Sequence, residues 1–193
     1  MKKIFILQLL AAGICSQGFS QNKFTDSLLR QLPLAKDDTS RVLIMGELSF
    51  HYRYINIDSA IYYGEQALSL SERIHFLRGE ANALTHIGQA MREKGDLPKA
   101  LELQIRARNI AKENNFTSEY ATALRRIGLV YMDLRDFPKT LSYLHQTLYQ
   151  AERIQSKRGM AIEYMNLGMT HEYMKNVDSA LFYVQKAFEG KAY

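Results

Sequence analysis

The chain has 193 residues, of which 47% are hydrophobic and 23% charged, and its formal net charge is +5, with 25 Lys and Arg against 20 Asp and Glu. This length and apolar content suit one folded domain with a real core and exclude wholesale disorder. A single cysteine excludes a disulfide framework and a cysteine-based zinc site, and the 11 glycines and three prolines are too few for a β-sandwich or barrel with many short turns.

The first 20 residues (1–20) have the layout of a secretory signal peptide. Lys2 and Lys3 precede a mainly apolar run, Ile4 to Ile14, and small and polar residues follow up to Ser20. This run is much shorter than the ~20 residues that a membrane-spanning helix needs. We therefore expect cleavage after Ser20 and an exported chain, periplasmic or extracellular, without a membrane segment. Loss of the two lysines would lower its net charge to +3.

An N-terminal arm is expected over residues 21–38. Phe24 to Leu32 read as a short helix that ends at Pro33, because proline restricts the residue before it and lacks an amide hydrogen.

From residue 39 onward the sequence repeats with a period of 40. Four segments align without a gap, at about 39–77, 78–117, 118–157 and 158–193. A repeat of this length is typical of a solenoid, in which each unit packs on its neighbours. The best-kept columns are Ala60, Ala100, Thr140 and Ala180; Ala67, Ala107, Thr147 and Ala187; and Leu48, Gly88, Gly128 and Gly168.

Each unit is predicted to contain two helices. The first has an apolar stripe at helical spacing, which in the second unit is Leu84, Ile87, Gly88 and Met91. Gly95 ends it, because glycine readily adopts the left-handed conformation of a C-cap. The second helix begins after a good N-cap residue, which is Asn56, Asp96, Asp136 or Asn176. Small residues in both helices let the pair approach closely, so a large side chain at Gly128 is expected to cost about 1–3 kcal/mol.

These residues resemble a known family. The pattern of Leu84, Ile87-Gly88, Met91, Ala100, Gln104 and Ala107 is similar to the tetratricopeptide repeat. The resemblance implies an all-α, right-handed superhelical solenoid of antiparallel helix pairs, and it covers residues 39–193. It says nothing about the identity of a ligand.

The sequence departs from this family in two ways. The usual period is 34 residues, and the six extra residues follow Ala107, where they lengthen either the second helix or the loop after it. The first unit has Glu47 and Leu48 in the columns of Ile87 and Gly88, as terminal repeats are often atypical.

The last unit has no further helix to cover it. Apolar residues that such a helix would otherwise cover are Leu181, Phe182, Val184, Phe188 and Tyr193. A solenoid normally needs a polar capping element. Three interpretations stay open: the chain is a piece of a longer protein, this end pairs with itself or a partner, or the last helix frays.

No catalytic, metal-binding or cofactor motif is found. The five histidines are His51, His75, His86, His145 and His171, and no two are three or four residues apart, which excludes a helical metal pair. Nucleophile and phosphate-binding motifs are absent as well. We therefore expect no enzyme activity, no metal and no cofactor. The small positive charge and the expected export also argue against a nucleic-acid partner.

With these functions excluded, the remaining one is binding of a protein or peptide on a surface of complementary shape, since stacked helix pairs form an extended concave surface. By resemblance, this surface is lined by the first helix of each pair. Arg92 and Arg125 are candidates to pair with an acid or a peptide carboxylate, and replacing both with Glu is expected to weaken partner binding and leave helicity unchanged. A methionine stripe suits varied apolar partners, but it also suits packing between repeats. The candidate partner-binding residues are Tyr52, Asn82, Thr85, Gln89, Arg92, Arg125, Met132, Met165 and Met169.

The expected function is that of an exported scaffold that binds a protein or peptide and has no catalytic role. One alternative is the sensory region of a bacterial signalling protein, such as a histidine kinase or a transcriptional regulator. A second alternative is a module that self-assembles through its C-terminal helix.

Overall fold

The structure is a computed structural model that describes residues 23–189, and within this range it contains helices and no strands. The all-α prediction is therefore confirmed for these residues. The expected signal peptide, residues 1–20, and Tyr193 lie outside the described part. Residues 23–31 are helical and lead into a short 3-10 helix at Pro33. The elements that follow are η1 (Leu32–Leu34), α2 (Asp38–Tyr52), α3 (Ile57–Arg73), α4 (Leu77–Lys94), α5 (Leu97–Glu113), α6 (Thr117–Asp133), α7 (Phe137–Arg153), α8 (Lys157–Tyr173) and α9 (Val177–Glu189).

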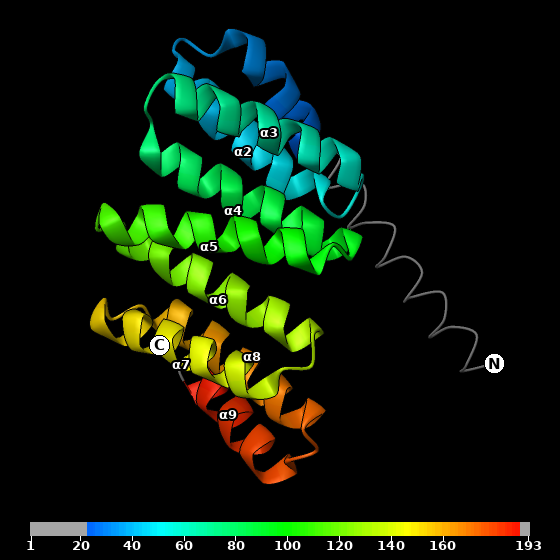
Figure 1. The fold of residues 1–193 in the computed structure, drawn as a ribbon, viewed down its shortest axis with the longest axis vertical. Coiled ribbons are helices and arrows are strands. Elements are labelled where there is room, and N and C mark those ends of the chain that lie inside the picture. Colours follow the sequence, from blue (N-terminus) through cyan, green and yellow to red (C-terminus); the bar gives the residue numbers. More distant parts are fainter. Residues whose placement is uncertain (1–22, 190–193) are drawn as a thin grey trace, which may run out of the picture.

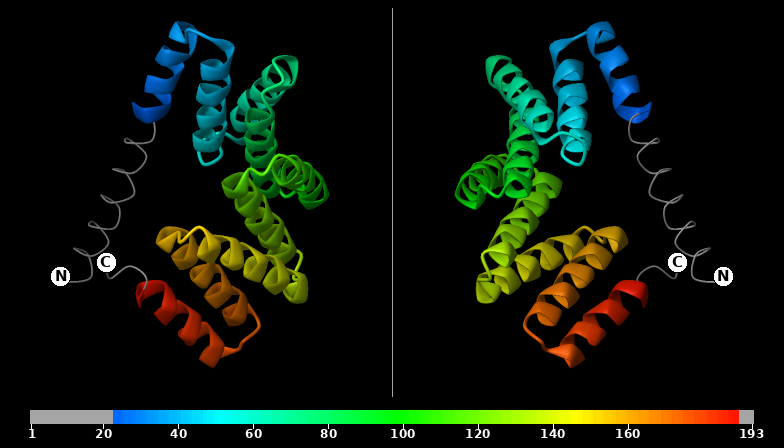
Figure 2. Two further views of the ribbon diagram at one scale, coloured as in Figure 1. Left: turned by 90° about the vertical axis from the view of Figure 1, so that its left-hand side faces the viewer. Right: turned by 90° about the vertical axis from the view of Figure 1, so that its right-hand side faces the viewer.

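The helices form pairs that stack in chain order (Figure 1). Each helix packs on the one before it and the one after it, and the stack bends so that its two ends lean toward the same side (Figure 2). This is the predicted solenoid of helix pairs. The second helix α5 continues to Glu113 and only three residues separate it from α6. The extra residues of the 40-residue unit therefore lengthen helices and not loops.

The predicted caps begin the second helix of each pair. The side chains of Asn56, Asp96 and Asp136 accept hydrogen bonds from backbone amides three residues later, at 2.9, 3.0 and 3.1 Å. Asn176 makes the same contact at 3.5 Å. Each cap satisfies an amide that has no partner inside the first helical turn. The N-cap prediction is confirmed, and so is the end of α4 at Gly95, whose φ is +89°.

Between equivalent positions of its two helices, the first pair has one residue fewer than the third: the stacked rings are Tyr52 and Tyr63, 11 residues apart, against Tyr131 and Tyr143, 12 residues apart. In the second pair, the amide of Asp96 bonds the carbonyl of Met91, five residues back, around the left-handed Gly95. The turns after α6 and α8 repeat this geometry. In the first pair, the amide of Asn56 bonds the carbonyl of Tyr52, only four residues back, at 2.7 Å. The whole of α2 is therefore offset by one residue from the 40-residue register.

This offset corrects the sequence alignment of the first unit. Leu48 is fully buried, as the later residues of the aliphatic column are, whereas Glu47 is exposed. Leu48 and Ser49 thus take the places of Ile87 and Gly88. The expected match of Glu47 with Ile87 is wrong, because it assumed a turn of the same length in every unit.

Small residues do lie where the paired helices approach most closely. A Cβ on Gly88 would lie 2.6 Å from Gln104 Nε2, and one on Gly168 would lie 2.9 Å from Val184 Cγ2. In the first pair the glycine lies on the second helix and not on the first. Gly64 of α3 faces Ser49 of α2 at this contact. The predicted close approach is confirmed, since even one carbon would force these neighbours to move.

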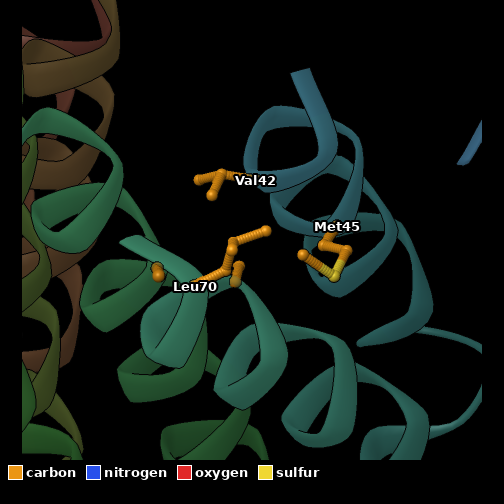
Figure 3. Close-up of a cluster of buried hydrophobic side chains, with 5 residues drawn as sticks. Val42, Met45 and Leu70 are labelled. Atoms are coloured by element: carbon orange, nitrogen blue, oxygen red, sulfur yellow. The ribbon is translucent and has the colours of Figure 1, made fainter. Parts of the chain in front are cut away.

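The core runs along the stack as a series of clusters. Figure 3 shows the first cluster, in which Val42 and Met45 of α2 meet Leu70 of α3. Two further clusters follow, one around Leu84 and one around Leu144. Each cluster joins neighbouring helices only, as expected of a solenoid.

Candidate functional site

The first helices of the pairs line the inside of the bend. Helix α2 packs on α4, and α4 packs on α6, while the second helices of successive pairs lie further apart. Side chains continue this row from α6 to α8, where Arg125 bonds Glu163. In a curved stack the closer row is the inner one. We call the surface formed there by α2, α4, α6 and α8 the inner face.

Two of the predicted arginines tie successive first helices together. Arg92 Nε donates to Asp133 of α6 at 2.6 Å, and Arg125 Nη1 donates to Glu163 of α8 at 3.0 Å. The Glu163 side chain is fully buried, and burial raises its pKa against the opposing effect of Arg125. Both arginines therefore have partners inside the chain, and the carboxylate that the sequence suggested for them comes from the protein itself.

Three other predicted residues are buried in the inner row. Thr85 Oγ1 donates to the carbonyl of Ala81 at 2.9 Å, and Gln89 is 3% exposed with an Oε1 that accepts no bond. Met132 is also buried and accepts a contact from Thr170 Oγ1 of α8 at 3.8 Å. Met132 therefore belongs to packing between repeats, which was one of the two interpretations of the methionine stripe.

Tyr52 does not lie at the position of Arg92, with which the 40-residue alignment had matched it. Its ring stacks on Tyr63 of α3, with centroids 5.5 Å apart. The same contact recurs as Tyr131 on Tyr143. Tyr52 thus lies inside its hairpin, and the short first turn places Arg53 where the later units have Arg92 and Met132.

The remaining predicted residues border hollows or stay accessible. Asn82 lines a small hollow of about 50 Å³ between α2 and α4. Met165 and Met169 on α8 are 36% and 38% exposed. A larger hollow of about 190 Å³ lies between α6 and α8, and its lining includes Thr122, Arg125, Ile162 and Glu163.

Sequence reasoning missed a basic and aromatic cluster on the inner face. The guanidinium carbon of Arg53 lies 3.8 Å from the ring centre of Phe50 and 4.2 Å from that of Tyr54, whose hydroxyl accepts a 2.7 Å bond from Arg53 Nη2. The ring of Phe50 also meets His86 of α4 edge-on, at 5.7 Å. Arg126 of α6 helps to lower the pKa of His86, and Arg53 helps to lower the pKa of Arg126. We call Arg53, His86 and Arg126 the basic cluster.

Charge in the basic cluster is of one sign. Burial, together with Arg126, Arg53 and His51, lowers the pKa of His86 to about 4. Burial also lowers the pKa of Arg126 to about 10, with a further contribution from neighbouring arginines. At neutral pH the imidazole is therefore neutral and both guanidinium groups remain cationic. The sequence signal that was available is the run Phe50-His51-Tyr52-Arg53-Tyr54, which the shifted register hid.

Residues 23–189 contain no group of three or more His, Cys, Asp and Glu side chains placed to hold a metal ion. None of the helices in this range combines the length and the hydropathy needed to cross a bilayer.

Comparison with known proteins identifies the fold. No family model and no curated protein matches the sequence. A Rap protein complexed with Competence and Sporulation Factor is similar over 92% of this chain and 53% of its own, with 17% identity and a TM-score of 0.77. A STAND protein from Pyrococcus horikoshii with a tetratricopeptide repeat sensor is similar over 91% of this chain and 27% of its own, with 20% identity and a TM-score of 0.72.

BtubC from P. vanneervenii is similar over 92% of this chain and 75% of its own, with 15% identity and a TM-score of 0.71. The chain thus spans about half of the Rap protein and about a quarter of the STAND protein. At these identities the likeness establishes the fold, which is a tetratricopeptide-repeat-like helical solenoid, as the resemblance implied.

Proposed function

We propose that this protein is a non-catalytic scaffold that binds a peptide or an extended protein segment along its inner face. The observations that carry the proposal are the exposed pair Met165 and Met169 on α8, and the separate 190 Å³ hollow between α6 and α8, whose lining on α8 includes Ile162 and Glu163. Methionine adapts its shape to varied apolar partners. The inner arginines and the basic cluster add polar groups that can fix the orientation of a bound chain.

The comparison with the Rap protein supports this use of the fold. That protein, at a TM-score of 0.77, was crystallised with Competence and Sporulation Factor. A solenoid of helix pairs offers a long curved surface on which an extended partner contacts several repeats at once.

The proposal is tested with random 12-residue peptides displayed on phage and selected on the immobilised protein. Enriched peptides are then synthesised, and their affinity is measured for the protein and for two variants. Met165→Glu with Met169→Glu is expected to lose at least tenfold in affinity. Tyr149→Glu is the control, because Tyr149 is an apolar residue, 58% exposed, on the second helix α7. No enrichment, or equal affinity for the Met variant, would reject the proposal.

Export is a separate proposal that rests on residues 1–20. The order of charged, apolar and small residues supports a cleaved signal. Fractionation of cells that express the whole chain, followed by N-terminal sequencing, tests it. We expect a mature chain that begins near Gln21 outside the cytoplasm, and a cytoplasmic chain that retains Met1 or Lys2 would contradict export.

Self-association is a second candidate function that α9 favours. Leu181, Phe182 and Phe188 are 65%, 54% and 60% exposed on this helix. Analytical ultracentrifugation distinguishes the two candidates: a dimer that Leu181→Glu dissociates supports self-association, and a monomer at all concentrations rejects it. The sensory alternative rests on the STAND protein, whose tetratricopeptide repeat sensor has this fold.

A further inference from the structure

The turn between α5 and α6 contains the acceptor triplet of N-linked glycosylation. Asn115, Phe116 and Thr117 form an Asn-x-Thr sequence in which x is not proline, and no other asparagine of the chain is followed two residues later by Ser or Thr. This triplet directs a glycan to the asparagine side chain of exported proteins. Glu113 also provides the acidic residue that bacterial oligosaccharyltransferases require two positions before the asparagine.

The structure presents this triplet as an accessible turn at the edge of the stack (Figure 1). Asn115 and Thr117 are exposed, and Asn115 has a left-handed backbone with a φ of +57°. The amide of Thr117 donates to the carbonyl of Asn115 at 3.0 Å, which makes the turn compact. The side-chain amide of Asn114 donates to the carbonyl of Ile110 at 2.8 Å, whereas that of Asn115 has no hydrogen-bond partner among residues 23–189.

Phe116, the middle residue of the triplet, anchors the turn. Its side chain is partly buried, and the guanidinium carbon of Arg78 lies 4.6 Å from the ring centre. Arg78 also pairs with Glu119 of α6 at 3.4 Å. The middle side chain is therefore held against the protein while its two neighbours stay exposed, so a glycan on Asn115 would displace no packed side chain.

The fold does not require asparagine or threonine at these two positions. Asparagine tolerates a left-handed backbone better than most residues, but His75 and Gln155 adopt the same conformation one repeat before and one repeat after, at φ values of +56° and +51°. The residues in the place of Thr117 are Leu77 and Lys157. The geometry of the turn therefore does not explain the Asn-Thr pair, whereas an acceptor function accounts for both residues.

We propose that Asn115 is the acceptor for an N-linked glycan. The site rests on the proposed export, because the glycan is transferred to chains that leave the cytoplasm, and it is independent of peptide binding on the inner face. Glycosylation adds a bulky, solubilising group to a surface, here at the edge between the second and the third helix pair.

The donor in this reaction is an oligosaccharide linked to a lipid through a diphosphate, and an oligosaccharyltransferase catalyses the transfer. The Nδ2 atom of Asn115 forms a bond with the anomeric carbon of the first sugar and loses one proton to a base. The bond between this carbon and the diphosphate oxygen breaks, and the lipid diphosphate leaves with the electron pair. The transfer is redox-neutral, so it needs no further reactant.

The test is translation of the whole chain with microsomes, whose membranes hold an oligosaccharyltransferase and its lipid-linked donor. Protection from added protease identifies the imported chains. Peptide N-glycosidase removes an N-linked glycan and converts the modified asparagine to aspartate. We expect the imported chains to carry one glycan, and mass spectrometry after its removal to find aspartate at position 115.

Substitutions in the turn then locate the acceptor. Asn115→Gln and Thr117→Val should be imported and carry no glycan, whereas Thr117→Ser should keep it because the hydroxyl is retained. Asn109→Gln is the matched control, since Asn109 is an exposed asparagine of α5 outside any such triplet. Produced without a transferase, Asn115→Gln should melt like the unmodified protein, because Gln155 takes the same place in the next repeat.

The outcomes separate the glycan from export. Imported chains without a glycan, or a glycan that remains on Asn115→Gln, would overturn the acceptor site and leave export in place. If residues 1–20 do not direct import, the same variants are imported behind a signal peptide of known activity. A glycan on Asn115 of those chains would support the acceptor site and reject export by the chain's own signal, and its absence would overturn the acceptor site.

Discussion

The charge of the buried Glu163 depends on Arg125, which opposes the rise of its pKa that burial causes. Glu163 is fully buried, and its bond with Arg125 at 3.0 Å is its main compensation. We expect Arg125→Met to lower the free energy of unfolding at neutral pH by about 3–5 kcal/mol, because it leaves a buried carboxylate without a partner. Urea denaturation measures the loss. Arg125→Met combined with Glu163→Gln should cost clearly less, and an equal cost would show that the ion pair is not the cause.

The same pair changes what the sequence led us to expect of a double charge reversal. Arg125→Glu would place a second carboxylate against Glu163. The combination with Arg92→Glu was expected to leave helicity unchanged. The structure instead predicts a less stable fold, so a loss of binding in that variant would not identify a binding residue.

His86 makes the stability of the protein depend on pH. Its pKa is about 4 in the folded state and about 6.5 as an ordinary value. As the pH falls from about 6.5 to about 4, the unfolded chain takes up a proton that the folded chain does not, and the free energy of unfolding falls. The shift corresponds to a loss of about 3 kcal/mol, which is complete below pH 4.

Urea denaturation of the protein and of His86→Asn between pH 4 and pH 7 measures this effect. The difference between the two isolates His86, because the raised pKa of the buried Glu163 acts in the opposite direction in both. An NMR titration that gives His86 a pKa near 6.5 would contradict the prediction.

At the scale of the element, left-handed residues close the hairpin turns. Gly95 has a φ of +89°, and Lys175 adopts a φ of +60° at the equivalent place after α8. A Cβ on Gly95 would meet nothing within 4 Å, so Gly95→Ala measures only the cost of the backbone conformation. We expect it to destabilise the protein by about 1 kcal/mol, and Lys175→Gly to stabilise it by about as much. Urea denaturation midpoints that move in the same direction would contradict this.

Much of the fold could be predicted because its signals are local. The caps at Asn56 and Asp96 and the end of α4 at Gly95 depend on neighbours within one turn. The close approach at Gly88 follows from a column of small residues. The shorter first turn could not be predicted, because Leu48 is a plausible core residue in either register and one missing residue leaves no gap in the pattern.

The candidate site was less predictable, because its residues come from different helices and because the register of α2 was misassigned. The basic cluster draws Arg53, His86 and Arg126 from three different helices, and the register error exchanged Arg53 for Tyr52. Whether an arginine is paired also depends on side chains about 40 residues away, as Arg92 with Asp133 illustrates. Periodicity alone does not contain this information.

At the scale of the molecule, stability is distributed unevenly along the stack. Helix α4 has neighbours on both sides and many buried residues, whereas Ala187 is the one buried residue in the described part of α9. In a solenoid each unit depends on its neighbours, so we expect local opening to begin at the C-terminal pair. Hydrogen exchange should be slowest in α4 to α6 and fastest in α9. Uniform protection along the stack would contradict this expectation.

The inner face as the binding surface is tested most directly by NMR of the protein with a selected peptide. We predict that backbone amide shifts change mainly in α2, α4, α6 and α8, with the largest changes near Arg126, Met165 and Met169. Changes confined to the second helices α5 and α7, or to α9 alone, would place the partner elsewhere and contradict the account.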